Sequence, residues 1–181
     1  QRVKQLLDDW EIGPKEKVAM LSEGQKQRLS IIQALGHDPE LLILDEPVAS
    51  LDPSARRQFI KQIIELNMDV DKTILFSTHI TSDLERVASE VALLKDGNIY
   101  YQGGLDKLKE KVVRIRIQSQ RELPAALPIS NSLHSKVEGN LAIVTTEEFD
   151  EVQLINLQKE FSASVTTERL NLEEIFLELH R

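Results

Sequence analysis

The sequence predicts an α/β protein with a mostly parallel sheet, followed by a small α+β unit. The continuous apolar run at 41–44 is typical of a parallel strand covered on both faces, and the segment 73–77 is a second candidate for a buried strand. A capped helix is predicted between them, as in a βαβ unit. Residues 112–118 alternate between apolar and polar side chains, which indicates a half-buried strand of another kind. We therefore predict two domains, residues 1–104 and 105–181.

Composition narrows the possible functions before any motif is considered. The 181 residues include 22 basic and 30 acidic side chains, and a net charge of -8 argues against nucleic acid as a partner. The absence of cysteine excludes disulfides and thiolate chemistry. No apolar run approaches the roughly 18 residues that span a bilayer, and no signal peptide opens the chain. We expect a soluble, cytoplasmic protein, and Gln1 in place of methionine predicts a fragment of a longer chain.

The first two predicted helices differ in how sharply they begin. Apolar residues at helical spacing across 2–10 predict a short surface helix. Ser22 and Gln25 then fit a capping box, so the next helix begins here and ends at Gly36. The cap by itself is fully explained by helix stability. An exposed helix start with free N–H groups, a hydroxyl and a glycine at Gly24 also suits an anion, so both interpretations stay open.

Two adjacent acids follow the first predicted strand. Asp45 and Glu46 come after the apolar run 41–44, at the strand end where open α/β sheets bind ligands. A carboxylate at Asp45 suits a magnesium ion whose other ligands include substrate phosphates. Glu46 is then placed to take a proton from an attacking water. The alternative is that both acids lie exposed in a loop or cap the following turn, and the run itself does not distinguish the two.

The next segment adds a histidine to the same edge of the sheet. Asp52 followed by Pro53 is a helix N-cap with proline at the first helical position. The strand predicted at 73–77 leads directly to His79, which therefore lies at the edge that carries the two acids. A lone histidine is more often structural, but this shared edge makes a catalytic role about equally plausible. The core face of the helix is predicted to comprise Phe59, Ile60, Ile63, Ile64 and Leu66.

The remaining elements complete the two predicted domains. A second capping box at 82–85 opens a helix. The Asp96-Gly97 turn predicts a hairpin at the antiparallel edge of the parallel sheet. Acids interrupt the basic run 107–121, so a solvated face is favoured over nucleic-acid binding. After residue 104 we predict helices at 105–111, 149–161 and 172–179, strands at 112–118 and 164–169, and a hairpin over 134–146.

Four short motifs together resemble the ABC-type ATPase domain of the P-loop class. Leu21 to Gln25 resembles the ABC signature, with Glu23 where the family most often has glycine. The segment 41–46 resembles the Walker B strand with its catalytic glutamate. The segment 50–52 resembles the D-loop, and 77–79 the switch-histidine loop. Because the motifs occur in the family's order, the resemblance is specific, and it implies that residues 1–104 are the carboxyl-terminal part of such a domain.

The part of the family's domain that binds the phosphates has no counterpart in this sequence. No G-x-x-x-x-G-K-[ST] motif occurs, and the family's loop glutamine is absent upstream of the signature. In the family, two domains pair head to tail, and the signature of one closes over ATP held by the phosphate loop of the other. The resemblance therefore implies that these 181 residues by themselves bind ATP weakly and do not hydrolyse it.

The resemblance also implies a set of roles in a complete dimer. The cofactors are ATP and Mg²⁺, and the partners are a second ATPase subunit, in a homodimer, and an integral membrane permease on whose cytoplasmic side the protein sits. The carboxyl-terminal unit with its closing NLEEIFLEL resembles the extension of bacterial drug, peptide and sodium exporters, which predicts export. The implied roles are catalysis by Glu46 and His79, magnesium binding by Asp45, closure over ATP by Ser22, Gly24 and Gln25, and communication between sites by Asp52.

Two other functions are consistent with the same motifs. A soluble ABC ATPase acting in translation or DNA repair needs no permease, but such proteins usually carry tandem domains or long coiled-coil insertions, and neither appears in the sequence. A truncated, non-enzymatic module that pairs with an intact subunit is the second alternative.

Overall fold

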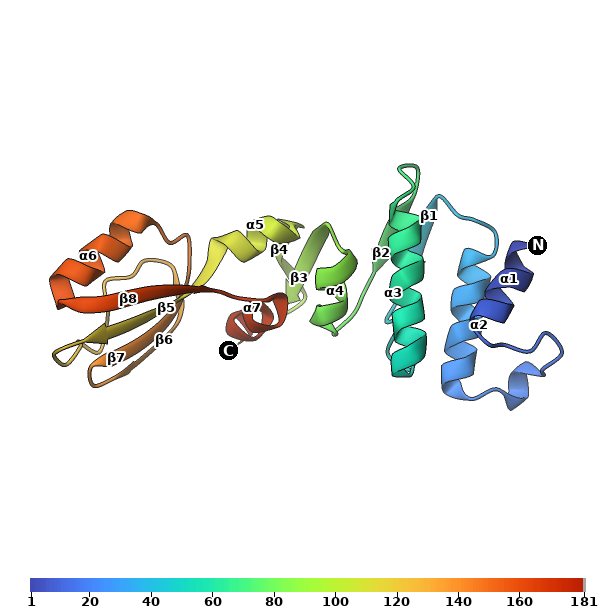
Figure 1. Ribbon diagram of the computed structural model, residues 1–181, viewed down its shortest axis with the longest axis horizontal. Helices are drawn as coiled ribbons and strands as arrows, with labels where there is room; N and C mark the ends of the chain where they lie inside the picture. The colour runs from blue at the N-terminus through green and yellow to red at the C-terminus, as the bar shows by residue number, and fades with distance from the viewer. Residues whose placement is uncertain (181) are drawn as a thin grey trace. The chain divides into compact units, whose positions relative to one another are not determined.

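The computed structural model describes residues 1–180, which form two compact units divided between Val87 and Ala88 (Figure 1). Each unit has its own buried core and is described by itself. The domain boundary at residue 104 stays a prediction, because units defined by contacts within this chain need not coincide with the limits of a family domain. The first unit contains α1 (Arg2–Asp9), a 3-10 turn (Val18–Met20), α2 (Glu23–Leu35), β1 (Leu41–Leu44), α3 (Pro53–Asn67), β2 (Thr73–Phe76) and α4 (Thr81–Val87).

The core of the first unit forms between α2, α3 and the strand pair. Phe59, Ile60 and Ile63 of α3 are almost completely buried, as predicted. The ring of Phe59 meets that of Phe76 edge-on, with centroids 6.0 Å apart. Ile64 was predicted in the same core but is 42% exposed, because it lies at the margin of the apolar stripe of the helix. The buried cluster comprises Leu6, Trp10, Ile12, Ile31, Ile32, Leu35, Leu42, Val48, Leu51, Ala55, Phe59, Ile60 and Ile63.

The two strands of the first unit pair in parallel, but only one of their faces is covered. Leu42 is buried in the helix-packed core. Leu41, Ile43 and Leu75, on the opposite face, are 57%, 65% and 61% exposed. The prediction of strands covered on both faces is therefore wrong for residues 1–180. An apolar run marks a strand able to be buried on both sides, but only packing decides whether a second layer is present.

The helix that follows β2 begins earlier than predicted. Ser82 was expected to be its N-cap, whereas α4 starts at Thr81 and Ser82 is an exposed residue of the first turn. The reason is a hydrogen bond from the Asp83 N–H to the Ile80 carbonyl, 3.1 Å, which closes the turn one step earlier. Asp83 is buried, and its carboxylate lies 3.8 Å from the guanidinium of Arg56 on α3.

The second unit opens with the predicted hairpin. Asp96 and Gly97 occupy the left-handed region, with φ values of 51° and 76°, as a two-residue type I′ turn requires. The two strands pair antiparallel with each other, and their place at the edge of the parallel sheet stays a prediction. The bounds are β3 (Glu90–Lys95), β4 (Asn98–Gly104) and, immediately after them, α5 (Leu105–Lys111).

A four-stranded antiparallel sheet with the order β6-β7-β5-β8 forms the rest of the second unit. Ile115 and Ile117 of β5 are buried with Leu157 of α6, so that helix covers one face of the sheet (Figure 1). The alternation predicted at 112–118 is confirmed. The bounds are β5 (Val112–Ser119), β6 (Ser132–Glu138), β7 (Leu141–Glu147), α6 (Glu151–Phe161), β8 (Ala163–Arg169) and α7 (Leu172–Leu179).

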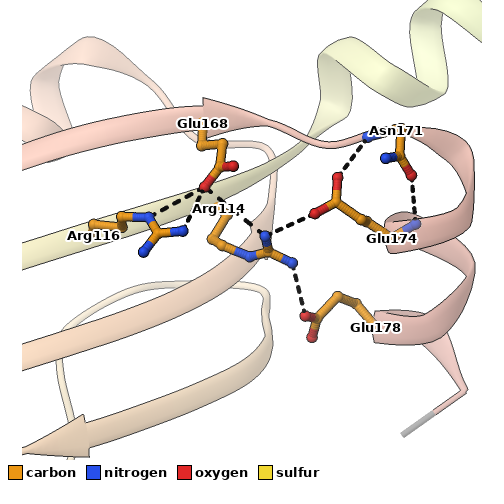
Figure 2. Close-up of polar contacts among 6 residues, drawn as sticks. All are labelled: Arg114, Arg116, Glu168, Asn171, Glu174 and Glu178. Carbon is orange, nitrogen blue, oxygen red and sulfur yellow. Dashed lines mark hydrogen bonds and ion pairs between the residues drawn. The ribbon is translucent and has the colours of Figure 1, made fainter.

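A network around Arg114 fastens α7 to the sheet (Figure 2). The Arg114 guanidinium lies 3.0 Å from the Glu174 carboxylate and 3.3 Å from that of Glu178. The Asn171 backbone N–H donates to Glu174, and this bond, with Arg114, holds the pKa of Glu174 below its ordinary value. The Glu178 carboxylate is buried beside this cation. Arg116 instead meets Glu168 in solvent, 3.0 Å away, so only part of the basic run is a solvated face.

We predict that Arg114→Ala lowers the free energy of unfolding by roughly 3–5 kcal/mol, because it removes the cation from a buried carboxylate. Arg116→Ala is the matched control and should cost less than about 1 kcal/mol, since both partners of that pair are about half exposed. Urea unfolding of the 181-residue chain measures both values. Equal, small effects of the two substitutions would contradict the anchoring role of Arg114.

Candidate functional site

The candidate site lies where the parallel strands end. Leu44 pairs with Phe76 in the register of β1 and β2. The Ser77 N–H extends this pairing by one more bond, 3.0 Å to the Leu44 carbonyl. Parallel pairing therefore brings Asp45 and Glu46, which follow β1, to the same edge as the residues that follow β2.

Glu46 and His79 meet at this edge. The His79 Nδ1 and the Glu46 Oε2 are 3.0 Å apart, and the side chains are 70% and 39% exposed. Glu46 has a φ of 44°, in the left-handed region that residues other than glycine seldom adopt. Such backbone strain persists only where the surroundings impose it, and it is frequent at functional sites. The fully buried Val48 anchors the turn that carries Glu46.

A serine joins the two acids. The Glu46 backbone N–H donates to the Ser77 hydroxyl oxygen, 2.9 Å away, and that hydroxyl donates to Oδ1 of Asp45. Sequence reasoning gave Ser77 no role of its own. The signal that identifies it is the strand register, because extending the pair Leu44–Phe76 by one residue sets Asp45 beside Ser77.

The start of α2 is the second part of the site. The Ser22 hydroxyl accepts from the Gln25 N–H, 3.3 Å, and the Gln25 side chain accepts from the Ser22 N–H, 2.9 Å, which confirms the capping box. A Cβ on Gly24 would lie 3.0 Å from the Ser50 carbonyl oxygen, so glycine permits the close approach of these two segments. Glu23 extends into solvent and pairs with Lys26 at 2.7 Å.

Asp52 ties the start of α3 to α2. Its carboxylate accepts from the backbone N–H groups of Ser54 and Ala55, at 2.9 and 3.0 Å, which confirms the predicted N-cap. It also pairs with the Arg28 guanidinium. The Ala55 N–H foremost, together with Arg28, holds the pKa of Asp52 below its ordinary value. Sequence reasoning missed this link, because no local pattern around Arg28 indicates that the fold brings Asp52 beside it.

A second contact fixes α2 against the turn that carries the acids. The Gln27 side-chain amide donates to the Pro47 carbonyl, 3.1 Å away. Through residues 27 and 28, one helix is therefore held against both the acid turn and the start of α3. Within residues 1–180, neither Ser22 nor Gln25 hydrogen bonds to Asp45, Glu46 or His79.

The carboxylate oxygens at the strand edge fit a magnesium ion only if water and substrate phosphates supply its remaining ligands. Among residues 1–180, no three histidine, aspartate or glutamate side chains are grouped to hold a metal. Asp45 is exposed, and its Oδ1 already accepts from Ser77, which leaves Oδ2 for a cation. Magnesium commonly binds through one or two carboxylates, with water and substrate phosphates completing its shell. The arrangement fits such a site.

The candidate residues line neither of two hollows in the first unit. One, of about 370 Å³, is lined by residues of α1 and α3 together with Asp38 and Lys72. The other, of about 390 Å³, is apolar and lies between α1 and α2. Asp45 and His79 are exposed at the strand edge and Glu46 is half-buried beside them.

We predict that Ser22→Ala lowers the free energy of unfolding by about 1 kcal/mol, because the first turn of α2 loses its cap. Ser22→Asp should stay close to the parent protein, since a carboxylate accepts the same N–H bond. Ser30→Ala is the matched control, because it removes an exposed hydroxyl from the same helix without touching the cap. Urea unfolding measures all three. An unchanged Ser22→Ala variant would show that the box adds nothing to stability.

Comparison with known proteins connects this geometry to one family. Residues 1–49 match the family model described as ABC transporter. Over 96 residues, the chain is 42% identical to the uncharacterized ABC transporter ATP-binding protein YxlF of Bacillus subtilis (strain 168), covering 53% of this chain and 32% of that protein. It is 32% identical over 168 residues to the Nod factor export ATP-binding protein I of Rhizobium meliloti (strain 1021), covering 90% of this chain and 49% of that protein.

Import proteins are also similar to the chain. The methionine import ATP-binding protein MetN of Protochlamydia amoebophila (strain UWE25) is 33% identical over 125 residues, covering 68% of this chain and 36% of that protein. The chain thus spans less than half the length of each of these relatives. Similarity by itself therefore does not give the direction of transport.

The fold matches that of a solved ATP-binding cassette. The similar structure is a dimeric post-hydrolysis state bound to ADP and phosphate, with a TM-score of 0.52 and 27% identity, covering 57% of this chain and 46% of that chain. No helix within residues 1–180 is long and apolar enough to cross a membrane.

Proposed function

The chain belongs to the family of ABC transporter ATP-binding proteins, and on this premise we propose that it forms the hydrolytic and closing half of an ATP site shared between two subunits. The observation that carries the proposal is the 3.0 Å contact between Glu46 and His79, beside the exposed Asp45. A base, a histidine and a cation ligand at one open edge are the groups that hydrolysis of a phosphoanhydride needs.

Glu46 is the general base in this proposal. With His79 donating through Nδ1 to Oε2, the other oxygen of the Glu46 carboxylate is free to accept a proton from water. That water attacks the γ-phosphorus, the bond from phosphorus to the bridging oxygen breaks, and ADP and phosphate leave. In this proposal the Nε2 atom of His79, which does not take part in the contact with Glu46, would contact the γ-phosphate.

Asp45 would hold the magnesium ion, which neutralises the charge on the phosphate oxygens. The exposed position of its carboxylate supports a ligand role shared with nucleotide and water. The proposed site therefore needs residues that bind the phosphates themselves. The 181 residues contain no phosphate loop to do so.

We place the start of α2 opposite ATP that the phosphate loop of a second subunit holds. Ser22, Gly24 and Gln25 stand at the positive end of a 13-residue helix, where backbone N–H groups favour a phosphate. The dimeric state of the similar cassette supports this pairing. Asp52 would relay closure to the hydrolytic edge, because Arg28 joins it to α2 and Gln27 joins α2 to the acid turn.

Export is the proposed direction of transport, with a membrane permease as partner on the cytoplasmic face. The likeness to the Nod factor export protein extends over 90% of this chain and so includes most of the second unit. We propose that this unit is an accessory module of the export subunit. ATP binding would close the dimer and hydrolysis would release it, and the permease would respond to that shift.

We predict that Glu46→Gln, in a dimer that includes the phosphate loop, lowers steady-state ATP hydrolysis by about 100-fold or more while ATP still binds. The amide cannot accept the proton but keeps the shape of the side chain. Glu65→Gln, on the exposed surface of α3, is the matched control and should hydrolyse ATP at the parent rate. Hydrolysis within a few-fold of the parent in Glu46→Gln would refute the general-base assignment.

We also predict that the 181-residue chain by itself binds ATP weakly and does not hydrolyse it, because nothing in the sequence supplies a phosphate loop. Nucleotide titration followed by calorimetry measures the affinity, and phosphate release measures turnover. Micromolar or tighter binding would contradict this prediction and would indicate a nucleotide site outside the shared edge.

A further inference from the structure

We propose that Ser77 is a positioning residue, which sets the orientation of both acids at the strand edge. The inference rests on the proposed function, because it concerns the geometry that Asp45 and Glu46 need for hydrolysis. Ser77 itself touches neither the attacking water nor the phosphate in this proposal. It acts through the two hydrogen bonds of its hydroxyl.

The two bonds fix one direction for the hydroxyl. A serine hydroxyl has a single proton to donate and two lone pairs to accept with. The backbone N–H of Glu46 can only donate, so at 2.9 Å the Ser77 oxygen is the acceptor. The proton of Ser77 is then free for Oδ1 of Asp45, which can only accept when ionised. Donor and acceptor roles are thus satisfied together in a short chain, and each bond polarises the other.

The bond to Asp45 decides which carboxylate oxygen is available. Because Oδ1 accepts from Ser77, the carboxylate cannot rotate freely, and Oδ2 is the oxygen left to face a cation. A ligand oxygen held in one place is a requirement of the near-octahedral shell of magnesium. Without the hydroxyl, Asp45 is an exposed side chain with no fixed rotamer.

The hydrogen bond between the Glu46 N–H and the Ser77 hydroxyl holds Glu46 in an unfavourable backbone conformation. A φ of 44° at a residue other than glycine needs a restraint, and the N–H of this same residue is the group that Ser77 fixes. The Glu46 side chain starts from that backbone and reaches His79 at 3.0 Å. Loss of the hydroxyl therefore releases the backbone first and the contact between base and histidine second.

The adjacent hydroxyl in the same loop provides a contrast. Thr78 accepts from the Ile80 N–H, 3.0 Å away, and that contact stays within the loop. Ser77 instead crosses from one strand end to the other and meets two residues of the acid turn. A hydroxyl that merely satisfied the loop would make a contact like that of Thr78.

The first test is structural and uses the 181-residue chain. Ser77→Ala should accelerate amide hydrogen exchange at Glu46, measured by NMR, by about fivefold to tenfold, because the N–H loses its acceptor. Ser77→Thr keeps the hydroxyl and should restore the parent rate within about twofold. Thr78→Val, which removes the adjacent hydroxyl, should leave the exchange rate at Glu46 unchanged. An unchanged rate at Glu46 in Ser77→Ala would overturn the proposal.

The second test measures hydrolysis in the dimer that includes the phosphate loop. Ser77→Ala should lower kcat by about tenfold to 100-fold, with the KM for ATP within about twofold, because misplaced groups slow the chemical step rather than binding. Ser77→Thr should recover most of kcat. A normal kcat in Ser77→Ala despite faster exchange at Glu46 would overturn the catalytic consequence. Normal hydrolysis in Glu46→Gln would overturn the proposed function instead, so the two failures are distinguishable.

Discussion

The parallel register of β1 with β2 is the constraint on which the candidate site depends. It is only four residue pairs long, yet it aligns the ends of two segments that are about 30 residues apart in the chain. Were the register shifted by one residue, Ser77 would no longer lie beside Asp45, and His79 would move away from Glu46. Helices α2 and α3 support this register by burying Leu42 with Phe59 and Ile60 on one face of the strands.

Caps at the candidate site stabilise helices with the same atoms that the proposed function uses. The Ser22 hydroxyl satisfies an N–H of α2, and Asp52 satisfies two N–H groups of α3. These bonds fix where each helix begins, and the proposed closure over ATP needs those starts in fixed positions. The ion pair with Arg28 joins the Asp52 cap to α2. The explanation of each cap by helix stability is therefore compatible with the proposed functional role.

The second unit shows how a buried charge can organise a small fold. Arg114 lies on β5, and its acidic partners Glu174 and Glu178 lie on α7 (Figure 2). The end of that helix is also fixed to the hairpin, since the Lys95 side chain donates to the Leu179 carbonyl. Helix α7 is thus held at both ends by polar contacts whose partners are far apart in sequence. In a small unit such contacts specify one packing arrangement, which apolar burial by itself leaves less defined.

The sequence by itself determined the local features: the caps at Ser22 and Asp52, the Asp96-Gly97 turn and the alternation of β5. Each of these depends on residues within a few positions of one another, so its physics is contained in a short window. It also predicted that the acids and His79 share an edge, because parallel strands end together. Only the tertiary structure decided the bridge through Ser77, the left-handed backbone of Glu46 and the exposure of Leu41 and Ile43. These features depend on register and on which layers are present, and no local pattern of residues encodes either one.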